Sequence, residues 1–194
     1  FDGGYFRVKD NPERSISLIV LAQSACAFIG GTGPVAGRGT VGGMPFAPTL
    51  SVHAADVEVD EETGKVKIVA YAAAQDVGRA LNPMSIEGQI QGAVTQGIGM
   101  ALMEKIVFEK GVVQNADLTD YRMPTATDVP MLEIMIVEVP SDEGLYGIRH
   151  VGEPPMVATL AAIGNAIYNA CGIRMRETPM TPEAILKAIK ADKK

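Results

Sequence analysis

Cysteine and histidine are scarce in this sequence, which contains two of each among 194 residues. Cys26 and Cys171 lie far apart in apolar surroundings, so neither a disulfide framework nor a Cys-rich metal site is expected. Two buried thiols in a reducing, cytoplasmic compartment are expected instead. Because His53 and His150 are the only histidines, a zinc site made of His and Cys has too few ligands, and no metal ligand is predicted.

Long apolar runs and dense basic clusters are also lacking. The longest apolar run, residues 16–29, is interrupted by Ser17, Gln23 and Ser24 and is too short and polar to span a bilayer. No signal peptide is recognisable, and the start at Phe1 rather than at methionine suggests truncation or processing. The net charge is −6, and basic residues gather densely only at the C-terminal end, where they suit a solvated helix end. Neither a membrane nor nucleic acid is therefore expected as a partner.

The composition favours a globular protein with a substantial core. Hydrophobic residues make up 47% of the chain, enough for one domain or for two closely packed lobes at about residues 1–80 and 81–194. The 21 glycines are unevenly distributed, and seven of them fall between Gly30 and Gly43, which predicts a loop. Within this loop, residues 31–37 lack the spacing and the closing acidic residue of a dinucleotide-binding fingerprint.

Apolar periodicity and turn residues predict an alternation of strands and helices. Strands are expected over residues 1–8, 50–60, 65–74 and 131–139, and a strand pair over 106–114, with 50–74 forming a β-hairpin. Helices are expected over residues 15–27, 85–105, 156–170 and 181–190, with Ser85 and Thr181 as N-caps. The third helix is apolar nearly all round, so we expect it to be buried and to end at Gly172. This order fits an α+β fold of mixed sheets and packed helices.

The predicted helix over residues 85–105 contains four glycines, at positions 88, 92, 97 and 99. Each one weakens a helix by up to roughly 1 kcal/mol relative to alanine, so another interaction must offset the loss. Two explanations remain open and are compatible. Either the glycines allow close packing against a neighbouring helix, or they let a ligand approach the backbone and the amides of Gln89, Gln91 and Gln96.

Residues 146–155, with the sequence YGIRHVGEPP, place one carboxylate between a glycine and two prolines at the start of a predicted helix. Gly152 leaves room for a bulky group beside the backbone, and Pro154 and Pro155 restrict φ after Glu153. One interpretation is a carboxylate held for chemistry. The other is an acidic residue that complements the dipole at the N-terminus of the helix. Residue types alone favour the second.

Four motifs occur in a fixed order and resemble those of a known family. The sequence resembles the C-terminal part of the molybdopterin-binding subunit of the xanthine dehydrogenase and aldehyde oxidase family, the molybdenum hydroxylases. The similarity is weak before Gly30 and strong from His53 onward. The motifs are DVGRALNP at 76–83, EGQIQGAVTQG at 87–97, DYRMP at 120–124 and VGEP at 151–154, followed by GIRMRE at 172–177 before TPE at 181–183.

This resemblance implies oxidative hydroxylation of an electron-poor carbon in a small-molecule substrate, such as an aldehyde or an N-heterocycle like a purine, with water as the oxygen source. Glu153 matches the family's active-site glutamate, the base that takes a proton from a molybdenum-bound hydroxyl. Gln89 matches a glutamine that hydrogen-bonds the molybdenum centre, and Gly152 borders the same cofactor. The resemblance also implies molybdopterin as cofactor, with iron–sulfur clusters and FAD on partner chains or domains.

The sequence also departs from the family. Arg149 and His150 stand where related sequences commonly have Lys-Gly or Lys-Ala, so His150 either shapes the substrate pocket or, as we favour, faces solvent. The family subunit is several times longer than 194 residues. We therefore expect a fragment, an isolated domain or one piece of a split subunit, with another chain or segment completing the pocket. The alternative function is a non-catalytic domain that cannot bind the cofactor alone.

Overall fold

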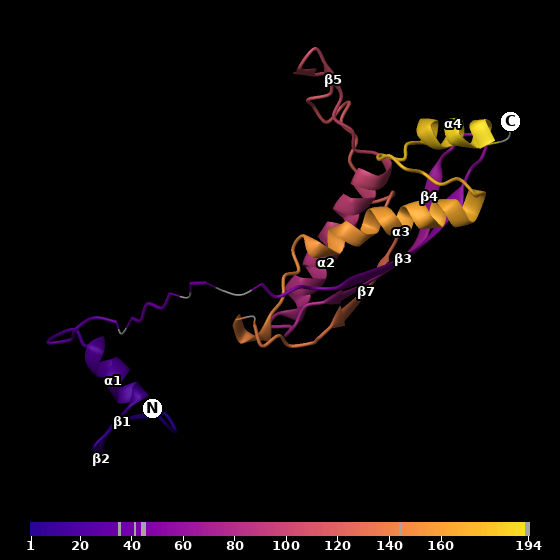
Figure 1. Cartoon of the computed structure of the whole chain (residues 1–194). Helices are drawn as coiled ribbons and strands as arrows, with labels where there is room; N and C mark the ends of the chain where they lie inside the picture. Colours follow the sequence, from indigo (N-terminus) through magenta and orange to yellow (C-terminus); the bar gives the residue numbers. More distant parts are fainter. Residues whose placement is uncertain (35, 41, 44–45, 144, 193–194) are drawn as a thin grey trace. The chain divides into compact units, whose positions relative to one another are not determined.

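The computed structural model describes residues 1–34, 36–40, 42–43, 46–143 and 145–192 (Figure 1). Contacts within the chain define two compact units, Phe1–Gly43 and Met44–Lys194. The suggested boundary between lobes near residue 80 falls inside the second unit, between a strand and a helix that share one hydrophobic core. Two of the C-terminal lysines, Lys193 and Lys194, lie outside the described residues.

The first unit is a small hairpin followed by a short helix. Strand β1 (Tyr5–Val8) pairs antiparallel with β2 (Asn11–Ser17), and α1 (Leu18–Ala25) follows directly. The helix begins three residues later than predicted, because Ser15 and Ser17 pair with β1. The Ser17 hydroxyl then caps α1 by accepting a hydrogen bond from the Val20 amide at 3.2 Å.

The glycine-rich loop over residues 30–43 contains no helix or strand among its described residues, as predicted. Val35 and Val41 belong to the same prediction but lie outside the described residues.

A three-stranded sheet forms the base of the second unit, in the order β3-β4-β7. The predicted hairpin is present as β3 (Ser51–Val59) and β4 (Val66–Asp76), and β7 (Leu132–Val137) pairs parallel with β4. A register shift between Asp56 and Val57 marks a bulge in the hairpin. The bulge changes the alternation in β4, so Ile68, Tyr71, Ala73 and Gln75 all face the core.

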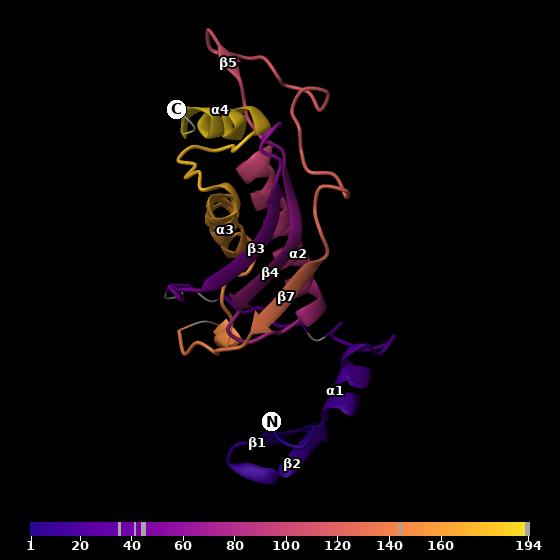
Figure 2. The same cartoon turned by 90° about the vertical axis from the view of Figure 1, so that its right-hand side faces the viewer.

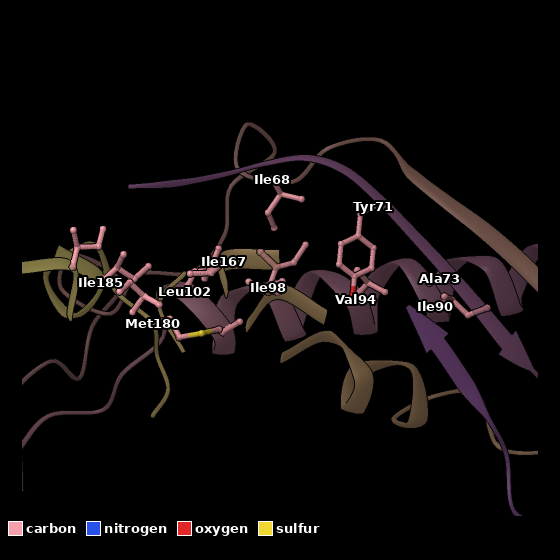
Figure 3. Packing of buried hydrophobic residues seen from close by; sticks show 14 of the residues in the cluster. Ile68, Tyr71, Ala73, Ile90, Val94, Ile98, Leu102, Ile167, Met180 and Ile185 are labelled. Carbon is pink, nitrogen blue, oxygen red and sulfur yellow. The ribbon is translucent and has the colours of Figure 1, made fainter. Parts of the chain in front are cut away.

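Two helices pack against this sheet and against each other, α2 (Pro83–Leu102) and α3 (Pro154–Cys171), with α3 along β3 and α2 along β7 (Figure 2). Their buried residues interleave with those of β4 in one core (Figure 3), which includes Tyr71, Ile90, Val94, Ile98, Ile163 and Ile167. The side chain of Asn82, rather than of Ser85, caps α2 by accepting from the Ser85 amide at 3.1 Å.

Helix α3 is not buried all round as predicted. Ile163 and Ile167 are fully buried, whereas Val157 is 73% exposed on the opposite side. An apolar pattern indicates only which residue types are buried on average. Among the described residues, the sheet and α2 cover one side of α3, so the apolar side chains on its other side stay exposed. The helix ends at Gly172 with φ 78°, as predicted.

The remaining elements agree with the sequence expectations. The strand pair over residues 106–114 is present as β5 (Phe108–Glu109) and β6 (Val112–Val113), and a 3-10 turn spans Leu145–Gly147. Helix α4 (Pro182–Asp192) is capped by Thr181, whose hydroxyl accepts from the Ala184 amide at 3.3 Å. The second unit therefore has the predicted α+β fold. None of the helices in the described residues is long and apolar enough to cross a membrane.

The prediction of two buried thiols is wrong. Cys26 is exposed at the end of the short helix α1, and Cys171 is partly exposed in the last turn of α3, where its thiol donates to the Ile167 carbonyl. Both cysteines are free. Their apolar sequence neighbours suggested burial, but both lie at helix ends, where one side of the chain faces solvent.

Candidate active site

Glu153 occupies the N-cap position of α3, but its side chain makes no capping hydrogen bond. The backbone carbonyl of Glu153 accepts from the Met156 amide at 3.0 Å, which starts the helix without help from the carboxylate. Helix α3 begins at Pro154, two residues earlier than expected, because proline tolerates the first turn, where its missing N–H has no partner to lose. The carboxylate is exposed and is not used as a cap.

An open pocket of about 750 Å³ lies beside Glu153. Two segments of the second unit form its walls, one leading into β3 and the other entering α3; the lining includes Phe46, Ala47, Pro48, Thr49, Leu50, Ser51, His150, Gly152, Glu153, Pro154, Val157 and Ala158. His150 is exposed, as we favoured, and it also contributes to the pocket wall. The pocket wall is therefore mainly apolar, with a carboxylate and an imidazole on it.

Gln89 of α2 lies next to Gly152, one of the residues that line this pocket. A Cβ atom at Gly152 would lie 3.6 Å from Oε1 of Gln89, so the amide of Gln89 borders the backbone that carries Glu153. Both Gln89 and Gly152 are exposed. The three site residues predicted from the sequence thus come together although they lie on different elements.

The four glycines of α2 divide between the two explanations that the sequence left open. A Cβ at Gly97 would lie 2.6 Å from Cβ of Thr159, and one at Gly99 would lie 2.8 Å from Cδ of Pro124, so these two glycines allow close packing. Gly88 and Gly92 have no atom within 4 Å of a Cβ in the described structure, and both are exposed. The face of α2 around Gln89 is therefore open and lacks side chains at two positions.

The end of β4 lies close to the pocket and carries a buried polar network. Gln75 is 0% exposed. Its amide nitrogen donates to Thr49 Oγ1 at 2.7 Å and to the Asp76 carbonyl at 3.1 Å, and its amide oxygen accepts from the Ser51 hydroxyl. The same hydroxyl lies 3.4 Å from the carbonyl oxygen of Pro154 in the first turn of α3. The network is made of amides and hydroxyls, and all polar atoms of Gln75 have partners.

Asp76, the last residue of β4, forms an ion pair with Arg149, with 3.1 Å between Oδ2 and Nε. The guanidinium of Arg149 also donates to the carbonyls of Pro48 and Val139. The other carboxylate oxygen of Asp76 accepts from the Gly78 amide at 2.9 Å. Gly78 has φ 67°, and a Cβ there would collide with the carbonyl of Gly147. The DVG motif at 76–78 therefore holds the segment that leads to Glu153.

Sequence reasoning missed a second polar cluster, centred on His53 in β3. Nδ1 of His53 lies 2.8 Å from the Tyr71 hydroxyl and 3.4 Å from Thr159 Oγ1, whereas its buried Nε2 has no hydrogen-bond partner among the described residues. Desolvation lowers the pKa of His53, and it raises the pKa of Tyr71 to about 12. The inward position of His53 in the predicted strand was the signal that could have revealed this cluster.

The DYRMP motif at 120–124 lies at the opposite, C-terminal end of α2. The Tyr121 hydroxyl donates to Glu104 at 2.5 Å, a hydrogen bond that raises the pKa of Tyr121, and Pro124 packs at Gly99. None of the five residues of this motif lines the pocket beside Glu153. The described residues contain no group of three or more His, Cys, Asp or Glu side chains arranged to hold a metal ion.

Comparison with known proteins explains the ordered motifs. Residues 1–130 match the family model of the molybdopterin cofactor-binding domain. The chain belongs to this family. The match to the family model ends before Glu153, but the alignment with a relative continues across Glu153. The chain is 34% identical over 185 residues to the putative xanthine dehydrogenase molybdenum-binding subunit XdhA of Escherichia coli, an alignment that covers 94% of this chain and 25% of the relative.

Other relatives point to the same class of protein. The chain is 36% identical over 151 residues to an aldehyde oxidoreductase of Megalodesulfovibrio gigas, covering 77% of this chain and 16% of that one. Among solved structures, quinoline 2-oxidoreductase of Pseudomonas putida matches with a TM-score of 0.67 and 35% identity, over 71% of this chain and 18% of that chain. A reconstituted CO dehydrogenase of Oligotropha carboxidovorans matches with a TM-score of 0.77 and 26% identity, over 98% and 24% respectively. The chain thus spans about a quarter or less of these proteins.

The residues present fit part of a molybdopterin site. The open face of α2 offers the amide of Gln89 and two positions without side chains, Gly88 and Gly92. Gly152 leaves space beside that amide. An amide can donate to oxygen atoms of a cofactor without adding charge, and backbone without Cβ atoms allows a large ligand to approach closely. These features fit a molybdopterin cofactor-binding domain in which Gln89 and the glycine backbone would contact the cofactor.

Proposed function

We propose that this chain supplies the catalytic base and one wall of the cofactor pocket in a molybdenum hydroxylase. The observation that carries the proposal is the position of Glu153, which faces an open pocket without capping its helix and stands next to Gly152 and Gln89. Membership in the molybdopterin cofactor-binding family and relatives named xanthine dehydrogenase and aldehyde oxidoreductase support it.

The reaction we infer is oxidative hydroxylation of an electron-poor carbon, in an aldehyde or an N-heterocycle such as a purine, with oxygen taken from water. The molybdenum cofactor, when bound, supplies the two-electron oxidation. Glu153 acts as the general base, its carboxylate accepting the proton that water-derived oxygen loses, which requires hydrogen-bond reach to that oxygen. Gln89 donates a hydrogen bond to the cofactor, and Gly152 leaves it room.

The proposal extends to partners. Another chain or segment completes the pocket on the open face of α2, and electrons leave through iron–sulfur clusters and FAD on partner chains or domains. We also propose a reducing, cytoplasmic setting for the assembled protein. Substitution of Glu153 tests whether its carboxylate acts as a base or only as an acidic residue at the start of α3.

We expect Glu153→Gln to leave the cofactor bound and to lower turnover by about two to four orders of magnitude, because a positioned base is lost while its shape is kept. Turnover and molybdenum content of the assembled enzyme measure the two effects. The matched control is Glu183→Gln, since Glu183 is an acidic residue in the first turn of α4. Near-normal turnover of the Glu153→Gln enzyme would refute the assignment.

The alternative function is a non-catalytic domain that cannot retain the cofactor alone. The open face of α2 favours this alternative for the chain by itself, because the described residues would contact a cofactor there from one side only. Purification from the native source, followed by native mass and metal analysis, distinguishes the two. Molybdenum that co-purifies with this chain and partner chains supports the hydroxylase, and a metal-free monomer contradicts it.

A further inference from the structure

Two adjacent residues at the end of β4, Gln75 and Asp76, interact with the chain on the two sides of Glu153: Gln75, through Ser51, on the side of Pro154, and Asp76 on the side of Arg149. Successive residues of a strand point to opposite faces. The side chain of Gln75 therefore turns into the core, toward the first turn of α3, while that of Asp76 turns toward Arg149. The strand end thus contacts the chain both before and after the carboxylate.

The contact after Glu153 runs through Ser51. The Ser51 hydroxyl donates to the Gln75 amide oxygen and also lies 3.4 Å from the Pro154 carbonyl oxygen, so its one proton goes mainly to Gln75 and the contact with Pro154 is the weaker of the two. Ser51 is also the residue paired with Gln75 in the sheet. Pro154 has no N–H, so its carbonyl is its only backbone hydrogen-bonding group. Because Gln75 is fully buried and all of its polar atoms have partners, moving it would leave unsatisfied groups in the core.

The contact before Glu153 is the ion pair between Asp76 and Arg149. The two side chains are only 12% and 16% exposed, so solvent screens the pair weakly. The backbone adds a second connection, because the Arg149 amide donates to the Val77 carbonyl at 2.9 Å and the Arg79 amide donates to the Gly147 carbonyl at 2.9 Å. The residues just before the pocket are therefore tied to the strand end by side chain and backbone together.

We propose that Gln75 and Asp76 are positioning residues that fix the backbone on both sides of Glu153 and so direct its carboxylate into the pocket. This inference rests on the proposed function of Glu153 as a base. Residues 150–153 lie between the two anchors, and this segment contains Gly152, which has no side chain of its own to pack. A base that must meet a reacting oxygen within hydrogen-bond distance requires such support from neighbouring residues.

The test uses the assembled enzyme with two variants, Asp76→Asn and Ser51→Ala. Asp76→Asn keeps shape and removes the charge that pairs with Arg149. Ser51→Ala keeps Gln75 and removes its link to Pro154. We expect kcat to fall by about 10-fold to 100-fold with KM within about twofold and molybdenum content unchanged, because a small displacement of a catalytic group lowers turnover strongly. Ser51→Thr, which keeps the hydroxyl, restores kcat.

Hydrogen–deuterium exchange supplies a readout that does not depend on activity. We expect faster exchange at the amides of residues 147–153 and of Met156 in both variants, with unchanged exchange in the buried turns of α2. Glu58→Gln is the matched control, because it removes an exposed ion pair with Lys67 in the same sheet. Unchanged exchange at residues 147–153 and at Met156, or an equal increase throughout the core, would overturn the positioning role.

The two proposals fail in different ways. If Glu153→Gln leaves turnover intact, the proposed function fails, whatever the exchange data show. If Glu153→Gln abolishes turnover while Asp76→Asn and Ser51→Ala change neither kcat nor local exchange, the function stands and the positioning role is wrong.

Discussion

Glu153 differs from the other helix-start residues in what its side chain does. Ser17, Asn82 and Thr181 each accept a hydrogen bond from an amide of the helix that follows them. Glu153 makes no such bond. A residue at an N-terminus that is not used as a cap keeps its acceptor oxygens available for other partners. The helix-dipole interpretation that residue types favoured therefore accounts for an acid at this position, but a capping hydrogen bond does not occupy its carboxylate.

At the scale of single residues, Gln89 offers the second test of the site. We expect Gln89→Ala to change the free energy of unfolding by no more than about 0.5 kcal/mol, because Gln89 is exposed. The electron paramagnetic resonance spectrum of the molybdenum centre in the assembled enzyme should nevertheless change, since a hydrogen-bond donor to the cofactor is lost. Gln91→Ala is the matched control from the same helix. An unchanged spectrum in the Gln89→Ala enzyme would argue against the contact.

The residues of the site differ in how far the sequence reveals them. Glu153, Gln89 and Gly152 were predicted because they lie inside short motifs whose order is specific. Asp76 lies in an equally visible motif, but its partner Arg149 is distant in the sequence and lies just outside the VGEP motif. Residue types do not indicate which acid pairs with which base. Gln75 showed no signal at all, because a buried amide in a strand looks like any polar strand residue.

Within the elements, α2 combines a packed end with an open face that we propose for cofactor binding. Gly97 and Gly99 are buried and face neighbouring side chains, whereas Gly88 and Gly92 are exposed. At about 100° per residue, Gly88, Gly92 and Gly99 share one face of α2, so Gly99 differs from the other two by its place near the C-terminal end of the helix, where Pro124 packs against it. From the sequence alone, both explanations had equal weight, because glycine spacing determines the faces of a helix but not what lies opposite each face.

A pair of glycine substitutions separates the two roles. We expect Gly97→Ala to lower the free energy of unfolding by about 1–3 kcal/mol, because the new methyl group meets Thr159 in a packed interface. Gly92→Ala should raise it by up to about 1 kcal/mol, since alanine favours the helix and nothing lies within 4 Å of its Cβ. Urea denaturation measures both. Equal effects of the two substitutions would contradict this division. In the assembled enzyme, we expect Gly92→Ala to lower molybdenum content.

At the scale of the whole molecule, the core of the second unit contains a titratable group that the proposed chemistry does not use. His53 joins β3 to Tyr71 of β4 and to Thr159 of α3. Its ring packs edge-on against the ring of Tyr71, with 5.6 Å between their centroids. Because the cluster connects three elements, its protonation state affects the stability of the whole unit.

The lowered pKa of His53 gives stability a definite dependence on pH. Desolvation disfavours the charged form in the folded state, so the unfolded chain, with a pKa near 6.5, binds the proton more tightly. The stability contributed by neutral His53 is therefore present above pH 6.5 and is lost as the pH falls through the lower folded-state pKa. We expect His53→Gln to flatten the decrease in unfolding free energy between about pH 7 and pH 5.

Denaturation curves at several pH values provide the measurement, and His150→Gln is the control because the other histidine is exposed. A slope in the His53→Gln protein equal to that of the wild type would exclude His53 as the titrating group.

By itself, the sequence determined the fold class, the hairpin, the family and three residues of the candidate site. Those features depend on local periodicity, turn residues and the order of short motifs, all of which can be read along the chain. Only the tertiary structure decided that the Glu153 side chain does not cap its helix, that α3 is exposed on one side and that Gln75 and Asp76 lie at the two flanks of Glu153. These outcomes depend on which distant segments meet, because burial and pairing are properties of packed neighbours rather than of residue types.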